Sequence, residues 1–133
     1  VLGIINHYTR SYIYMIAYFK FIPTIKKSVI PNYSIFPNLD IIWFKDEVPK
    51  YAFEVEHTTG LRSGFQRLVQ LQPLGTKLFI IAKDADKNLF SQILNTDPFY
   101  KNRDSFRFKS YKDLEKFFVE VDRSEAIKKS FLE

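Results

Sequence analysis

The chain has 133 residues, of which 46% are hydrophobic and 17% aromatic, and it carries a formal net charge of +5. Its length suits one compact domain with a substantial core, and the absence of cysteine excludes disulfides and thiolate metal sites. Two histidines are too few for a histidine-rich zinc site, whereas the basic balance favours a polyanionic partner.

The first predicted element is a helix over residues 6–19, where tyrosines and other apolar residues recur at helical spacing. Residues 12–22 form the most apolar stretch, but Lys20 and the interleaved tyrosines argue against a membrane span. The opening V-L-G-I-I lacks an initiating Met and a basic signal-peptide start, which favours a fragment of a longer protein. We expect one cytoplasmic domain over residues 1–133, with its core at about 6–121 and no membrane association.

A connector with two lysines is predicted next, over residues 24–31. Lys26 and Lys27 are candidate phosphate contacts, although a solvated basic turn is the simpler interpretation. A short strand is predicted from Pro31 to Phe36.

The most informative stretch runs from Asn38 to Gly60, where two apolar runs flank a hairpin connection predicted over residues 45–50. Strand side chains alternate between faces, so Glu54 and Glu56 are predicted to share one face. The hairpin brings Asp40 alongside them. Carboxylates on so hydrophobic a strand are costly to bury without compensating charge, and a divalent cation with oxygen ligands supplies it. We therefore predict a metal site here.

The alternative is an ordinary amphipathic strand with Glu54 and Glu56 on its solvent face, continued by Ala52. The uninterrupted run I-I-W-F after Asp40 indicates instead a central strand covered on both faces. His57 follows on the opposite face and is interpreted as a strand-end histidine bonded to backbone.

A helix is predicted from Thr58 or Thr59, either of which can cap it, to about Leu71. Its buried stripe is expected to hold leucines and a phenylalanine: Leu61, Phe65 and Leu68. A neighbouring face of the same helix carries a polar stripe. Such a stripe usually faces water, but beside an acidic strand end it is suited to holding a phosphodiester. Its members are Arg62, Gln66, Arg67 and Gln70.

The run T-K-L-F-I-I-A, from Thr76 to Ala82, is the clearest buried strand, and the helical crossover before it implies parallel pairing in a mixed α/β sheet. A turn over residues 83–87, a helix over 88–95 and a strand over 105–108 are predicted to follow. A last helix opens with a capping-box pattern, Ser110 and Asp113, and its apolar face carries Leu114, Phe117, Phe118 and Val121. The tail over 122–133 is a helical extension or frayed.

This order of elements resembles the core of the PD-(D/E)xK nuclease superfamily, particularly restriction-endonuclease-like domains, over residues 33–82. The segment Pro37-Asn38-Leu39-Asp40 stands where the family has its P-D, and Glu54-Val55-Glu56 stands for (D/E)-x-K. The resemblance implies a three-layer α/β/α core. The departure is Glu56, where the family usually has lysine, although some restriction enzymes have glutamate there.

The resemblance further implies a metal-dependent DNA endonuclease of restriction or repair type, with Asp40, Glu54 and Glu56 as catalytic residues. Mg²⁺, or Mn²⁺ in its place, is expected on Asp40 and Glu54 with the Val55 carbonyl, and Glu56 is expected to handle the attacking water. Arg62 or Arg67, or a second metal, replaces the positive charge of the missing lysine. Thr58, Gln66, Lys26 and Lys27 complete the candidate DNA contacts.

The expected partner is DNA, with a homodimer for double-strand cleavage and base recognition left to another domain or subunit. The alternative function is a catalytically inactive nuclease-fold module for nucleic-acid binding or assembly. An unrelated α/β domain with merely superficial acids is the third interpretation.

Overall fold

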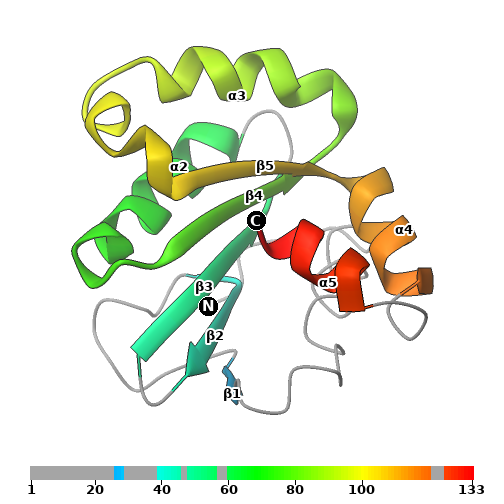
Figure 1. Cartoon of the computed structure of the whole chain (residues 1–133). Coiled ribbons are helices and arrows are strands. Elements are labelled where there is room, and N and C mark those ends of the chain that lie inside the picture. The colour runs from blue at the N-terminus through cyan, green and yellow to red at the C-terminus, as the bar shows by residue number, and fades with distance from the viewer. Residues whose placement is uncertain (1–25, 29–38, 46–47, 57–59, 121–124) are drawn as a thin grey trace.

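A computed structural model describes residues 26–28, 39–45, 48–56, 60–120 and 125–133 (Figure 1). The predicted helix over 6–19 and the strand over 31–36 lie outside these residues. Within them, the strands are β1 (Lys26–Ser28), β2 (Ile41–Lys45), β3 (Val48–Val55), β4 (Lys77–Ala82) and β5 (Phe106–Ser110). The α-helices are α2 (Leu61–Leu68), α3 (Lys87–Leu94), α4 (Tyr111–Glu120) and α5 (Glu125–Leu132), and the 3-10 helices are η2 (Val69–Leu74), η3 (Asp84–Asp86) and η4 (Phe99–Ser105).

The strands form one mixed sheet in the order β1-β2-β3-β4-β5. The pairs β1–β2 and β2–β3 are antiparallel, whereas β3–β4 and β4–β5 are parallel. The predicted α/β class, the acidic hairpin and the parallel crossover strand are therefore confirmed. The helical connections to β4 and β5 are what allow these strands to pair in parallel.

Two expectations about the hairpin region were wrong. The predicted connector over 24–31 contains β1, which pairs with the outer side of β2. The predicted connection over 45–50 is shorter, because Lys45 ends β2 and Val48 begins β3. A register shift between Trp43 and Phe44 places Phe44 opposite Pro49, and such an irregularity tolerates a proline, which has no N–H to donate.

The two faces of the sheet carry separate hydrophobic clusters, each covered by helices, so the core has three layers (Figure 1). On one face, α2, η2 and α3 pack over Ile42, Ala52 and Ile80. On the other face, α4 and α5 pack over Trp43, Phe53 and Phe79 and their neighbours. The predicted alternation along β3 is confirmed, since Ala52 belongs to the first cluster and Phe53 and Val55 to the second.

Helix α2 buries its predicted apolar stripe, Leu61, Phe65 and Leu68. Its N-cap is Gly60, which makes no side-chain cap hydrogen bond, so neither threonine takes the predicted capping position. The α-helix ends at Leu68 and tightens into η2, which contains Pro73. Gly75 then turns the chain with φ 72°, a left-handed conformation that favours glycine.

The predicted capping box is present at the start of α4. Ser110 N–H donates to Asp113 Oδ2 at 2.9 Å, and Asp113 N–H donates to Ser110 Oγ at 3.0 Å. Residues 125–132 of the tail form α5, and its Phe131 stacks on Phe117 with ring centroids 4.2 Å apart. None of the helices in the described ranges has both the length and the apolar character that crossing a bilayer requires.

Candidate functional site at the end of strand β3

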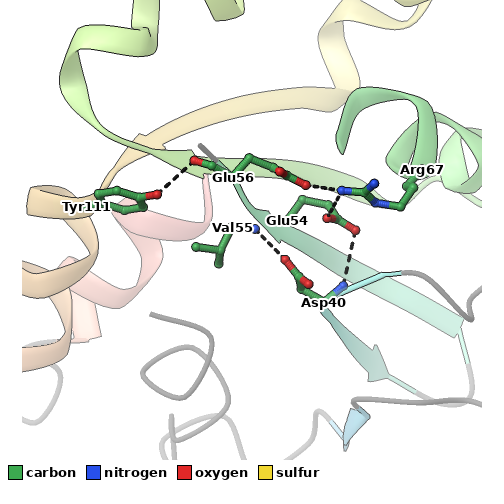
Figure 2. Close-up of polar contacts among 6 residues, drawn as sticks. All are labelled: Asp40, Glu54, Val55, Glu56, Arg67 and Tyr111. Atoms are coloured by element: carbon green, nitrogen blue, oxygen red, sulfur yellow. Dashed lines mark hydrogen bonds and ion pairs between the residues drawn. The ribbon is translucent and has the colours of Figure 1, made fainter. Parts of the chain in front are cut away.

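The register of the hairpin places two acids together. Ile41 pairs with Phe53 and Ile42 with Ala52, so the next position along brings Asp40 opposite Glu54. Asp40 N–H donates to Glu54 Oε1 at 3.3 Å, and Asp40 Oδ2 accepts from Val55 N–H at 2.8 Å (Figure 2). The Asp40 side chain thus caps β3 where β2 no longer supplies a backbone partner.

Glu54 lies inside the protein and not on a solvent face. Its side chain is only 1% exposed, and Ala52, on the same face of β3, is fully buried. The interpretation of β3 as an ordinary amphipathic strand is therefore wrong. Glu54 is on the face covered by α2, which supplies its charged partner.

The Arg67 guanidinium, which α2 supplies, contacts the carboxyl groups of both Glu54 and Glu56 (Figure 2). Its Nη2 donates to Glu54 Oε2 at 2.9 Å and also to Glu56 Oε1. Its Nε is buried and has no hydrogen-bond partner within the described part of the chain. Glu54 and Glu56 therefore share one guanidinium, and Asp40 lies beside Glu54, which leaves an excess of negative charge if all three carboxyl groups are ionised.

Burial is the main influence on the pKa values of the three acids. It raises the pKa of Asp40, although the Val55 N–H and the Arg67 charge act in the opposite direction. It raises the pKa of Glu54 well above the usual range, and the neighbouring Asp40 adds to this effect. Burial likewise raises the pKa of Glu56. For Arg67, burial acts to lower the pKa, but the Glu54 hydrogen bond and the carboxylates outweigh it and the pKa is raised.

The backbone of Glu56 is held from two directions. Its N–H donates to Ile81 O on β4 at 2.9 Å, and its carbonyl accepts from the Tyr111 hydroxyl at 3.0 Å (Figure 2). Tyr111 was not predicted from the sequence, because no local signal relates it to a residue 55 positions earlier. Gly60 and Gly64, which lie against the Glu56 side chain, were also missed. The sequence feature that could have revealed them is the presence of two glycines within one predicted helix.

The structure does not bring the other predicted polar residues to the acids. Arg62 Nη2 donates to Thr96 Oγ1 at 3.2 Å, and its Cζ lies 5.7 Å from the centroid of the Phe99 ring. Gln66 is exposed, and its carbonyl accepts from Gln70 Nε2 at 3.4 Å. The expectation that Arg62 and Gln66 join Arg67 in one pocket was therefore wrong. Thr58 and His57 lie outside the described residues, as do the side chains of Lys26 and Lys27.

The donor set suits a hard divalent cation, because it consists of carboxylate oxygens with surplus negative charge. No group of three or more acidic, histidine or cysteine side chains within the described ranges could hold a metal ion. Mg²⁺, however, is usually bound by one or two carboxylates together with water and substrate phosphates, and not by a closed protein cage. Asp40 and Glu54 are the pair of carboxylates that suits this mode of binding, and Arg67 contacts Glu54 as well as Glu56.

Comparison with known proteins relates this chain to a defined group. A family model described as the C-terminal domain of the type II restriction enzyme NmeDI matches residues 24–133. The type II restriction enzyme NmeDI of Neisseria meningitidis serogroup C is 38% identical over 77 residues, which cover 53% of this chain and 22% of that relative. No solved structure matches. Because the family model spans most of the sequence, the chain belongs to the family of the NmeDI C-terminal domain of type II restriction enzymes.

Proposed function

We propose that this domain is a metal-dependent DNA endonuclease of the PD-(D/E)xK type, which hydrolyses phosphodiester bonds of DNA in the cytoplasm. The observation that carries the proposal is the group formed at the end of β3 by buried Glu54 and the partly buried Asp40 and Glu56, with Arg67 as its cation. Membership of a restriction-enzyme family supports DNA as the substrate. A homodimer would provide one site for each strand, and base recognition would come from another domain or subunit.

Asp40 and Glu54 would hold Mg²⁺, or Mn²⁺ in its place. The Val55 carbonyl is the natural third ligand, because the N–H and C=O of one strand residue point to the same side and this N–H faces Asp40. A cation bound there would polarise the scissile phosphate and lower the pKa of a water molecule.

Glu56 would take the proton from the attacking water. Burial raises its pKa, and a raised pKa makes a carboxylate a stronger base. Arg67 would stabilise the negative charge that develops on the phosphoryl oxygens, in the role that lysine has in the wider superfamily. The other predicted contacts to the DNA backbone remain predictions: Lys26, Lys27, Thr58, Arg62 and Gln66.

The test is the rate at which the protein nicks supercoiled DNA as Mg²⁺ is increased. The parent should cut, Glu56→Gln should cut about 100-fold slower or worse, and Asp40→Asn should lose both cleavage and the Mg²⁺-dependent rise in melting temperature. Asp104→Asn, at an exposed acid in η4, is the control and should cut like the parent. Equal cutting by all four proteins would refute the three-acid mechanism.

A second candidate function is a nuclease-fold module that binds DNA without cutting it. The position of Arg67 favours it, because the guanidinium already neutralises Glu54 and Glu56 without any metal. Absence of cleavage by the parent with Mg²⁺ and Mn²⁺, together with salt-dependent DNA binding, would select this function.

A further inference from the structure

Helix α2 presents an unusual row of residues to Glu56. Gly60, Gly64 and Arg67 are spaced i, i+4 and i+7, so they lie on one face of the helix. Arg67 on this face contacts the Glu56 carboxylate. The two glycines need an explanation of their own, because nothing in the backbone requires them.

Neither glycine is explained by conformation. Gly60 has φ −96° and ψ −7°, which any residue adopts, and Gly75 is the glycine with a positive φ in the described part of the chain. Gly64 lies inside the helix, where glycine weakens folding about fivefold relative to alanine. Gly64 therefore costs stability unless its missing side chain makes room for something. Gly60 is the N-cap, where glycine is tolerated, so the reason to single it out must come from its neighbours.

The space that they leave is filled by Glu56. The three atoms nearest to a Cβ built at Gly60 all belong to the Glu56 side chain, and its Oε2 would overlap that Cβ. A Cβ at Gly64 would lie 3.0 Å from Glu56 Cγ, 3.1 Å from Ile80 Cδ1 and 3.3 Å from Glu56 Oε1. The nearest contact at each glycine is closer than packed side chains normally allow.

We propose that Gly60 and Gly64 are positioning residues, which form a side-chain-free face of α2 that fixes the Glu56 carboxylate beside Arg67. The inference rests on the proposed function only in treating Glu56 as the group that handles water. Since the atom met at Gly60 is the mobile end of Glu56, Gly60→Ala displaces the carboxylate and leaves the helix in place. At Gly64 the methyl group meets Cγ, which is nearer to the β3 backbone and less able to move.

The experiment is a set of double-mutant cycles read by thermal unfolding in EDTA, without DNA. Gly60→Ala and Gly64→Ala are each measured in three backgrounds. These are the parent, Glu56→Gln, which keeps the size and shape of the side chain at position 56, and Glu56→Ala, which removes that side chain beyond Cβ. Each glycine substitution should lower the melting temperature in the parent and in Glu56→Gln, and should be less harmful in Glu56→Ala by roughly 3 °C or more. Because alanine is a poorer N-cap than glycine, the difference between backgrounds decides the outcome at Gly60.

Ser63→Ala, at an exposed position of the same helix, is the control and should change the melting temperature equally in all three backgrounds. Equal effects of the glycine substitutions in all three backgrounds would overturn the proposal. An effect that disappears in Glu56→Gln as well would show that charge and not space is at issue, and would also overturn it. Failure of the parent to cut DNA would remove the nuclease function and leave these cycles intact.

Discussion

Replacing Arg67 by methionine removes the cation shared by buried Glu54 and partly buried Glu56 while keeping most of the apolar stem. The exposed fractions of the side chains are 1% for Glu54, 13% for Glu56 and 29% for Arg67. Breaking a fully buried ion pair by removing one partner costs about 3–5 kcal/mol. Because Arg67 is partly solvated, we expect about 2–3 kcal/mol at neutral pH, or roughly 8–12 °C in melting temperature for a chain of this size.

The loss should depend on pH with a definite sign. Burial raises the pKa of Glu54 and of Glu56 above the unfolded value of 4.5. These groups therefore favour the folded state at low pH, and that contribution is lost as pH rises through the raised values. Arg67 lowers both pKa values, so its removal raises them further and increases the loss at neutral pH. Near pH 4, Glu54 and Glu56 are protonated in both the parent and Arg67→Met, so the two proteins should differ little in stability.

The assay is thermal unfolding in EDTA from about pH 4 to pH 8. Arg62→Met is the control, because it removes the same charge from the same helix at a site that contacts Thr96 and not the acids. It should shift the melting temperature little, and equally at all pH values. A loss for Arg67→Met that is the same at both ends of the pH range would refute the electrostatic account.

Two further predictions concern the metal and the capping box. Mg²⁺ at about 100 times its dissociation constant should stabilise the parent by about 2.7 kcal/mol, and Glu54→Gln should abolish this rise in melting temperature; an equal rise in both proteins would place the ion elsewhere. Ser110→Ala should cost about 1 kcal/mol in thermal unfolding, because the N–H of Asp113 loses its side-chain acceptor, and an unchanged melting temperature would contradict this.

The features predicted well from the sequence are those set by local chemistry. From Leu78 to Ala82 the run is entirely apolar and suits a strand buried on both faces, and its parallel pairing followed from the crossover before it. Strand alternation was enough to put Glu54 and Glu56 on one face, and Asp40 opposite Glu54 follows from the hairpin. The capping box at Ser110 is likewise a local signal.

The features that were missed depend on partners distant in sequence. Strand β1 has only three residues and little apolar pattern, and it is a strand because β2 pairs with it. Arg62 and Arg67 are five positions apart, which is about 140° around a helix, so both cannot face the acids. Which of them does so depends on how α2 packs on the sheet, and that is fixed by the long-range contacts of Leu61, Phe65 and Leu68.

The hydrogen bond from Tyr111 to the Glu56 carbonyl has a consequence for the order in which the site is made. All three acids lie between residues 40 and 56, but the groups that fix Glu56 come from β4, from Arg67 and from a tyrosine 55 positions later. Contacts of such separation form late, after the entropy of closing long loops has been overcome. A nascent chain that has not reached Tyr111 therefore contains every acid but lacks one of the contacts that hold Glu56, and that contact forms only when the start of α4 reaches the end of β3.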